Sequence, residues 1–227
     1  MNEFLIKPVA TIKNGYNEKF GVPRQSGMAN KIKSEIIFEK EFCDENLIRD
    51  IEQYSHLWLI WSFSKNAGEW SPTVRPPKLG GNKRVGVFAT RSPYRPNSLG
   101  LTVVKLEEIK QGENGKVLVV SGADLVNGTP VFDVKPYLPY VDSIADAKGG
   151  FSEEHRDEIL QVTVPENIKE STPEEELSEI ISVLELDPKP AYQNDTQRIY
   201  GLSYKNYQVK FRYVNENEIL IIEIKGE

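Results

Sequence analysis

Cysteine and histidine are scarce in this chain of 227 residues, which contains Cys43, His56 and His155 and no others. A single cysteine excludes an internal disulfide and any cysteine-based metal cluster. A zinc site would need carboxylates to complete its ligand set, and they occur at no recognisable spacing. A Ser–His–Asp or Cys–His hydrolase would have to use one of the two histidines. His56 lies beside the apolar run LWLIW, which favours a structural role, and His155 lies in the charged segment SEEHRDE, which favours solvation.

Long hydrophobic runs and the common nucleotide-binding motifs are also missing. The longest apolar run, Leu57–Trp61, is far shorter than the roughly 18 residues that suggest a membrane span. The first residues, MNEFLIKPVATIK, lack the charged start and long apolar stretch of a signal peptide, so we expect a cytoplasmic protein with no membrane contact. No Gly-x-Gly-x-x-Gly turn or Walker A sequence is present, so any nucleotide-like cofactor would bind on a non-Rossmann frame.

Acidic residues are absent from one stretch, Ser71–Leu106, although the whole chain has a formal charge of −6. Seven cations lie in this stretch: Arg75, Lys78, Lys83, Arg84, Arg91, Arg95 and Lys105. The remainder of the chain therefore sums to −13, which is −6 minus +7. We call Ser71–Leu106 the cationic island. Its charge predicts an anionic ligand or a polyanion, and the net acidity of the chain argues against tight non-specific duplex binding but leaves a structured RNA open.

The pattern of apolar residues predicts a mainly β N-terminal domain. Strands are expected at Phe4–Ile12, Ser34–Phe42, His56–Phe63, Arg84–Thr90, Gly100–Leu106, Lys116–Asp124 and Asp133–Tyr137. The only helix expected among them is an amphipathic one at Asp44–Tyr54. Because a parallel sheet would need helices between its strands, a mostly antiparallel barrel or sandwich is favoured.

The C-terminal part has a different character, and the sequence predicts a small α+β subdomain there. A helix is expected at Pro173–Leu184 with Thr172 as its N-cap, and a hairpin is expected from Tyr207–Tyr213 and Glu218–Ile224. We place the boundary so that residues 1–150 form the β domain and residues 151–227 form the subdomain.

Two loops carry residues suited to ligand binding. Arg24 and Gln25 lie between Pro23 and Gly27, where a stiffened backbone presents a guanidinium and an amide. Arg91 and Arg95 lie four apart, each near a proline, and could clamp a carboxylate or phosphate unless they only bond loop carbonyls. A third candidate is Asp124, which follows an expected buried strand and could accept hydrogen bonds from a ribose or an amino group.

Five segments in this order, GVPRQSG, PTVRPPKLGGN, RVGVFATRSPYRPNSLGL, DLVNGTPVFDVKPYLPY and DPKPAYQ, resemble the TrmO (TsaA, YaeB) family over roughly residues 5–195. The resemblance implies a small antiparallel β-barrel methyltransferase domain with a C-terminal α+β subdomain that contacts the substrate tRNA. It implies an enzyme that uses S-adenosyl-L-methionine to methylate N6 of threonylcarbamoyladenosine at position 37, beside the anticodon. It also implies a homodimer with the cofactor near the subunit interface, and binding of the tRNA anticodon loop.

The resemblance carries particular roles onto residues of this chain. The implied cofactor-binding residues are Pro23, Arg24, Gln25, Ser64, Lys65, Arg91, Leu101, Ala123, Asp124, Leu125 and Val126. The sequence names no general base, and Asp187 and Tyr192 are the candidates for a catalytic role through contact with the substrate. The candidates for binding the tRNA substrate are Arg84, Arg95 and Lys189. Four positions depart from the family pattern: Ser64-Lys65 stands where many relatives carry His-Gln, Lys189 where Arg is usual and Asn127 where Asp is usual. The alternative interpretation is a non-catalytic RNA-binding barrel.

Overall fold

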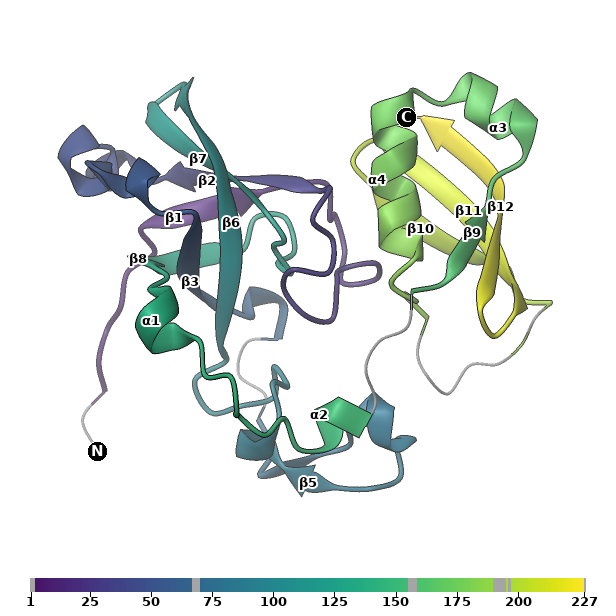
Figure 1. The fold of residues 1–227 in the computed structure, drawn as a ribbon, viewed down its shortest axis with the longest axis horizontal. Coiled ribbons are helices and arrows are strands. Elements are labelled where there is room, and N and C mark those ends of the chain that lie inside the picture. The colour runs from purple at the N-terminus through teal and green to yellow at the C-terminus, as the bar shows by residue number, and fades with distance from the viewer. Residues whose placement is uncertain (1–2, 67–69, 155–158, 190–194, 196, 227) are drawn as a thin grey trace.

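The computed structural model describes residues 3–66, 70–154, 159–189, 195 and 197–226. Six strands form a closed antiparallel barrel in the order β1-β2-β7-β6-β3-β8 (Figure 1). Their bounds are β1 Ala10–Lys13, β2 Lys33–Phe38, β3 His56–Ser62, β6 Leu99–Gly112, β7 Gly115–Ser121 and β8 Pro130–Pro136. Closure comes from β1, which pairs with β2 along its length and with β8 at Ala10 and Thr11.

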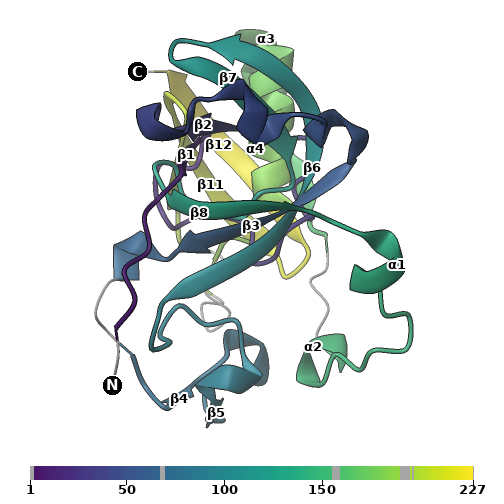
Figure 2. The same cartoon turned by 90° about the vertical axis from the view of Figure 1, so that its left-hand side faces the viewer.

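Short elements surround the barrel and carry much of the cationic island. A two-stranded sheet joins β4, Thr73–Val74, to β5, Val85–Gly86. The 3-10 helices are η1 Lys40–Phe42, η2 Glu45–Ile48, η3 Ile51–Gln53, η4 Ser64–Asn66, η5 Pro77–Leu79 and η6 Val87–Ala89. Two short α-helices follow β8, α1 at Pro139–Asp142 and α2 at Phe151–Glu154. Helix α2 and the β4–β5 sheet lie on the same side of the barrel (Figures 1 and 2).

The C-terminal part is a four-stranded sheet with two helices, in the strand order β10-β11-β12-β9. Its elements are β9 Gln161–Thr163, α3 Glu166–Ser171, α4 Glu174–Leu184, β10 Tyr200–Tyr204, β11 Tyr207–Asn215 and β12 Glu218–Gly226. The expected hairpin is β11–β12, and β9 adds to β12 in parallel. In the part of the chain that the structure describes, no helix is both long and apolar enough to cross a membrane. The mainly β architecture with a small C-terminal sheet agrees with the sequence expectation.

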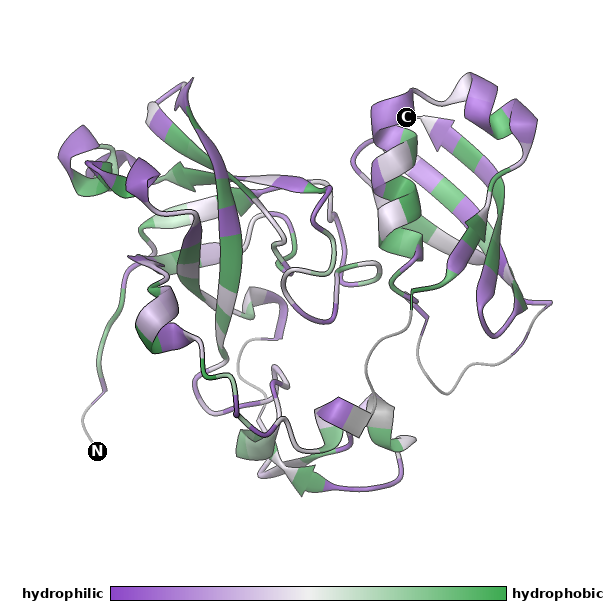
Figure 3. Cartoon of the chain, viewed as in Figure 1, coloured by the Kyte–Doolittle hydropathy of each residue, from purple (hydrophilic) through white to green (hydrophobic). Residues whose placement is uncertain are grey.

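Alternating side chains build the two hydrophobic cores. Along β3 every second residue is buried, so Leu57, Leu59 and Trp61 point into the barrel. The second core lies between the C-terminal sheet and α4, whose Ile180, Val183 and Leu184 face strands β10–β12. Hydrophobic and hydrophilic residues alternate along β6 and β12 in the coloured ribbon (Figure 3). Each part therefore has its own apolar interior.

The segment between β1 and β2 belongs to both parts of the molecule. It leaves the barrel after Lys13, yet its Tyr16, Ala29 and Ile32 are buried in the core of the C-terminal part. The Lys205 amide donates to the Gly15 carbonyl at 2.9 Å, and Tyr16 packs edge-on against Tyr204. The loop that carries Arg24 and Gln25 is thus fixed against the second domain.

Several expected elements differ in the structure. The amphipathic helix at Asp44–Tyr54 is wrong: Asp50 has a φ of 66°, which divides the segment into two 3-10 turns. The strand expected at Arg84–Thr90 is limited to Val85–Gly86, because the backbone then tightens into η6.

Two further corrections concern where an element starts. The first strand begins at Ala10 rather than Phe4, and Pro8, which lacks an N–H, lies just before it. Thr172 does not cap α4, since Pro173 occupies the N-cap position without a side-chain bond.

Gly100 is required by the packing of Trp61 inside the barrel. A Cβ at this position would lie 2.3 Å from Trp61 Cε2, much closer than carbon atoms approach. We therefore expect Gly100→Ala to lower the free energy of unfolding by roughly 1–3 kcal/mol. Thermal unfolding measures this loss as a Tm lower by several degrees. The matched control is Gly201→Ala in β10, where an added Cβ meets nothing within 4 Å. Equal Tm values for the two variants would contradict the packing argument.

Candidate cofactor and RNA groove

A large open groove of about 1860 Å³ runs between the barrel, the cationic island and α2. Most of the residues that the family resemblance assigns to ligand binding line it. These are Pro23, Arg24, Gln25, Ser64, Lys65, Arg84, Arg91, Arg95, Leu101, Asp124 and Val126. They come from five separate segments of the chain, so the fold brings together residues up to about a hundred positions apart, as from Pro23 to Val126.

The first of these segments is attached to the barrel through main-chain contact. The Gly27 amide donates to the Gly122 carbonyl at 2.9 Å. Gly122 has a φ of +79°, and a Cβ there would lie 3.2 Å from Gly27 Cα. Only glycine combines this left-handed conformation with so close an approach. The segment Gly21–Gly27 is therefore held against the turn that follows β7 and carries Asp124.

Gln25 and Arg91 meet across the groove. The Arg91 guanidinium donates from Nη1 to Gln25 Oε1 over 2.8 Å, although the two residues are separated by 66 positions. Because the amide oxygen is an uncharged acceptor, the pair keeps the positive charge of Arg91. The pair therefore presents a fixed cation and an amide N–H₂ to an anionic ligand.

A short chain of hydrogen bonds leads from the barrel interior to Asp124. Trp61 Nε1 donates to Thr102 Oγ1 at 2.9 Å, and the Thr102 hydroxyl donates in turn to Asp124 Oδ1 at 2.6 Å. Burial raises the pKa of the Asp124 carboxyl, while the Thr102 hydrogen bond, the Asp124 backbone N–H and the charge of Arg91 lower it. Asp124 is therefore an acceptor in a poorly solvated wall of the groove, beside a cation.

Two further arginines of the island are anchored by neighbouring segments of the island. Arg84 Nη1 donates to Thr73 Oγ1 at 2.8 Å, and Arg95 Nη1 donates to the Thr90 carbonyl at 2.9 Å. Arg95 thus makes the loop-carbonyl bond that the sequence left open as an alternative. Its guanidinium also lies 5.9 Å from the centre of the Phe88 ring, which is 78% exposed. This part of the groove combines fixed positive charge with an exposed aromatic surface.

Ser64 and Lys65 form the short 3-10 helix η4 directly after β3, at the edge of the groove. Both side chains are exposed. The Lys65 carbonyl accepts from Lys19 Nζ at 3.0 Å, so this main chain is tied to the segment that leads toward Arg24. The backbone of Ser64 and Lys65 is thus held by η4 and by the Lys19 hydrogen bond, whereas their side chains are exposed.

The remaining predicted residues lie elsewhere. Ala123 and Leu125 are buried under the Asp124 turn, where they pack with the barrel core. Asp187 and Lys189 follow α4 in the C-terminal part, and Lys189 is only 8% exposed. Tyr192 lies outside the described residues. Lys189 is enclosed because its ammonium lies 3.9 Å from the centre of the Tyr213 ring, which limits direct contact with a substrate.

Sequence reasoning missed the apolar wall of the groove. Trp61, Phe63 and Val103 line it together with Leu101, and the Trp61 and Phe63 rings meet edge-to-face at 4.3 Å. Part of this wall forms where β3 and β6 pair Trp61 with Gly100. That pairing depends on the register of the two strands, which a single amino-acid sequence does not reveal.

The groove thus has three chemical sectors: an apolar wall, a buried acceptor beside a fixed cation, and an exposed cationic and aromatic surface. An apolar wall with a few convergent polar groups is typical of a small-molecule site. The cationic and aromatic surface suits an unpaired nucleic-acid strand. Together they are the features expected of an enzyme that modifies RNA with a nucleoside-like cofactor.

Comparison with known proteins places the chain in one class of enzyme, the tRNA methyltransferases. The model for the tRNA-methyltransferase O N-terminal domain matches residues 11–143, and that for the TrmO C-terminal domain matches residues 157–227. The chain belongs to the tRNA-methyltransferase O (TrmO) family.

Individual relatives agree with this assignment. A tRNA (adenine(37)-N6)-methyltransferase of Escherichia coli is 34% identical, with 98% of this chain and 99% of the relative covered. A Pseudomonas aeruginosa protein, whose name describes an S-adenosylmethionine-dependent methyltransferase, is 36% identical over 97% of each chain. The crystal structure of TrmO from P. aeruginosa superposes with a TM-score of 0.78 at 30% identity, covering 99% of this chain and 100% of that one.

The Thr102 hydroxyl should control the ionisation of Asp124. Removing it in Thr102→Val deletes the strongest interaction that favours the carboxylate, so the pKa of Asp124, already raised by burial, should rise further. Carbon-detected NMR titration of the aspartate carboxyl groups measures this directly. The matched control is Thr163→Val, which removes a hydroxyl that donates to Glu218 at 2.9 Å in the other sheet. An unchanged Asp124 pKa in Thr102→Val would contradict the assignment.

The same shift fixes the sign of a pH effect on stability. Because the folded-state pKa of Asp124 lies above its unfolded value of about 3.9, the folded state holds the proton more tightly. The stabilising contribution of the protonated Asp124 carboxyl to the free energy of unfolding is fully present below the unfolded pKa. It is lost as the pH rises through the folded pKa. In Thr102→Val this loss should extend to a higher pH.

Proposed function

We propose that this protein uses S-adenosyl-L-methionine to methylate N6 of threonylcarbamoyladenosine at position 37 of tRNA. The observation that carries the proposal is the convergence of Gln25, Arg91 and Asp124 from three separate family segments on one groove. Membership of the tRNA-methyltransferase O family and relatives named tRNA (adenine(37)-N6)-methyltransferases support the reaction and the cofactor class.

The cofactor sector of the groove fits the groups that S-adenosylmethionine presents. Arg91, oriented by Gln25, is suited to the methionine carboxylate, and Asp124 is suited to an amino group or a ribose hydroxyl. The apolar side chains of Trp61 and Leu101 offer surface for the adenine ring. The main chain at Pro23, Ser64 and Lys65 and at the turn of Ala123, Leu125 and Val126 would complete the site. We assign these residues to the cofactor by this chemistry and by the family resemblance.

The substrate sector fits an anticodon loop, whose unpaired bases can stack on aromatic side chains. Arg84 and Arg95 supply fixed positive charge for phosphates or for the threonyl carboxylate, and Phe88 exposes most of its ring beside them. The C-terminal subdomain, residues 151–227 beyond a β domain of residues 1–150, would add contacts. Its candidates remain Asp187, Lys189 and Tyr192, although the enclosed side chain of Lys189 limits its direct contact with the tRNA.

The chemistry requires alignment more than covalent help from the protein. When bound, S-adenosylmethionine would supply the methyl group of its sulfonium to N6 and leave as S-adenosylhomocysteine, and the N6 proton would be released to the solvent. The residues of this chain orient the two reactants in line and exclude water. The apolar wall of Trp61, Phe63 and Val103 suits that exclusion. The Arg91 guanidinium is proposed to face the methionine carboxylate of the cofactor.

Assembly and location follow from the same proposal. We propose a homodimer in which a second copy covers the exposed apolar edge of the groove. Leu101, on the outer face of β6, is 57% exposed although it lines the site, and Leu99 beside it is 37% exposed. Such apolar exposure at a functional groove is the kind that a partner subunit covers. The cytoplasm, where tRNA is present, is the proposed place of action.

Loss of the Gln25–Arg91 pair should abolish methylation. We expect Arg91→Ala and Gln25→Ala to bind S-adenosylmethionine at least about tenfold more weakly, since each loses a charge-assisted or charge-orienting hydrogen bond. Calorimetry with S-adenosylmethionine measures the binding. Mass spectrometry of nucleosides from tRNA that carries threonylcarbamoyladenosine measures the methylated product.

Controls separate the proposed enzyme from a plain RNA-binding module. Arg49→Ala lies on the η2–η3 segment away from the groove and should retain full activity, and circular dichroism should show all variants folded. If the unchanged protein gives no heat with S-adenosylmethionine and no methylated nucleoside, the protein is not this enzyme. Full activity in both Arg91→Ala and Gln25→Ala would refute the proposed site.

Phe88 should bind the RNA rather than the cofactor. Removal of its ring in Phe88→Ala is expected to weaken tRNA binding by about 1–3 kcal/mol, the typical contribution of one stacked base. Filter binding of tRNA measures the loss, while calorimetry should show unchanged affinity for S-adenosylmethionine. Phe88→Tyr, which keeps an aromatic ring at the same exposed position, should bind tRNA nearly normally. Equal tRNA affinity for Phe88→Ala and the unchanged protein would exclude stacking.

A further inference from the structure

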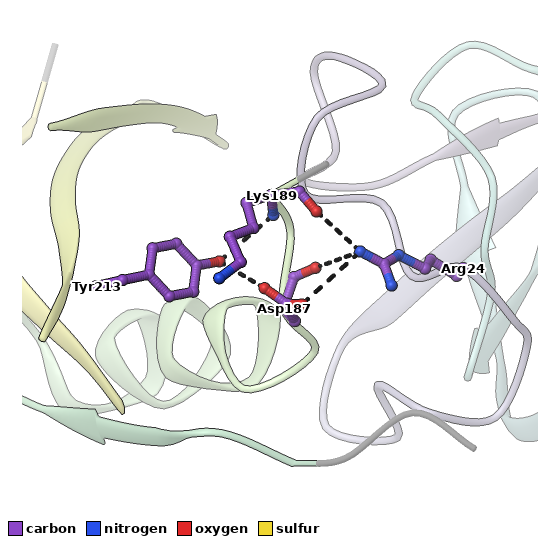
Figure 4. A network of polar contacts seen from close by, with 4 residues as sticks. All are labelled: Arg24, Asp187, Lys189 and Tyr213. Carbon is purple, nitrogen blue, oxygen red and sulfur yellow. Dashed lines mark hydrogen bonds and ion pairs between the residues drawn. The ribbon is translucent and has the colours of Figure 1, made fainter. Parts of the chain in front are cut away.

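We propose that Arg24 is a positioning residue that couples the two domains, and that it does not bind the cofactor directly. Its guanidinium joins the Gly21–Gly27 segment to the loop Asp187–Lys189 (Figure 4). The inference rests on the proposed function, because it assigns the two joined loops to the cofactor side and the tRNA side of one reaction. It departs from the family resemblance, which implies a direct cofactor contact for Arg24.

Two hydrogen bonds of Arg24 are directed to the C-terminal main chain. Its Nη2 donates to the Asp187 carbonyl at 2.9 Å and to the Lys189 carbonyl at 2.8 Å. Nη2 has two hydrogens, so these bonds use both. The Asp187 carboxylate lies 3.9 Å from the same nitrogen and adds ionic attraction. A cofactor carboxylate could take this nitrogen only if the contact between the domains were broken.

The receiving loop is held from its other side by Tyr213 of β11. The Tyr213 hydroxyl donates to Asp187 Oδ1 at 2.7 Å and accepts from the Lys189 amide at 3.4 Å, and the Lys189 ammonium covers the Tyr213 ring. Asp187 has a φ of 50°, a conformation that L-residues adopt only when the surroundings hold it. The loop Asp187–Lys189 is therefore held in one conformation between Arg24 and Tyr213.

The donating segment is fixed equally well on the cofactor side. Gln25, the next residue, points its amide to Arg91, and Gly27 is bonded to the Gly122 carbonyl. Adjacent side chains of one short segment thus face opposite partners: Arg24 the C-terminal loop and Gln25 the cationic island. A ligand that shifts Gln25 or Arg91 would move the attachment of Arg24, so binding at the two sides should be linked thermodynamically.

The experiment compares how Arg24 and Arg91 affect binding and turnover. In Arg24→Ala we expect the KM for tRNA to rise about tenfold, from the loss of charge-assisted hydrogen bonds. The affinity for S-adenosylmethionine, measured by calorimetry without tRNA, should change by less than about twofold, because the residues proposed to bind the cofactor are unaltered. Arg91→Ala should show the opposite pattern, with its main loss in S-adenosylmethionine affinity.

A second variant approaches the loop from the other domain. Tyr213→Phe removes only the hydroxyl that contacts Asp187 and Lys189, so it should raise the KM for tRNA in the same direction without a change in cofactor affinity. Because both side chains act on one loop, the double variant should lose less than the product of the two single effects. Tyr213→Phe keeps the buried ring and remains informative if Arg24→Ala fails to fold.

The outcomes are distinguishable from a failure of the proposed function. If the unchanged protein methylates tRNA but Arg24→Ala loses S-adenosylmethionine affinity as strongly as Arg91→Ala, Arg24 is a cofactor ligand and the inference is wrong. An unchanged KM for tRNA in both Arg24→Ala and Tyr213→Phe, or strictly multiplicative effects in the double variant, also overturns it. Absence of methylation by the unchanged protein instead refutes the function itself.

Discussion

The groove depends on contact between two loops, in which the Gly27 amide donates a main-chain hydrogen bond to the Gly122 carbonyl. This bond fixes the loop between β1 and β2 on the turn that ends β7, and it depends on the left-handed conformation of Gly122. Without this contact Gln25 would have no fixed position from which to meet Arg91. Asp124 lies on the same turn as Gly122, where the charge of Arg91 lowers the pKa of its carboxyl. The polar residues of the site therefore depend on backbone geometry, which side-chain chemistry alone does not provide.

The same loop explains why the two domains cannot be treated as separate modules. Its beginning, at Tyr16, is buried in the C-terminal core, and Gly21 lies where any Cβ would meet the side chain of Leu202. Its end returns to the barrel through Gly27. A segment that is fixed at both ends, by burial at Tyr16 and by a main-chain hydrogen bond at Gly27, can transmit displacement between the two parts. The position of the C-terminal sheet is thus mechanically tied to the groove.

The sequence predicted the mainly β architecture and most strand positions, because alternation of buried and exposed residues is a local property, as at His56–Ser62. Family segments also indicated which loops line the groove. Three features could not be predicted. The helix expected at Asp44–Tyr54 failed because one residue, Asp50, adopts a left-handed conformation. The Trp61–Thr102–Asp124 chain depends on strand register, and the burial of Lys189 depends on Tyr213.

Net positive charge is concentrated at the cationic island, which lines the groove. The cationic island carries +7 while the rest of the chain sums to −13, as the net charge of −6 requires. A nucleic-acid backbone is therefore repelled by most of the surface and attracted at one place, which favours productive encounters and disfavours extended non-specific contact. Screening over about 8 Å at physiological salt limits the attraction to molecules already near the groove. Arg84 and Arg95, bonded to neighbouring segments of the island, offer that charge at fixed positions. Fixed cations lose less entropy on binding than mobile ones, so the island can hold an anionic ligand at defined positions despite the net acidity of the chain.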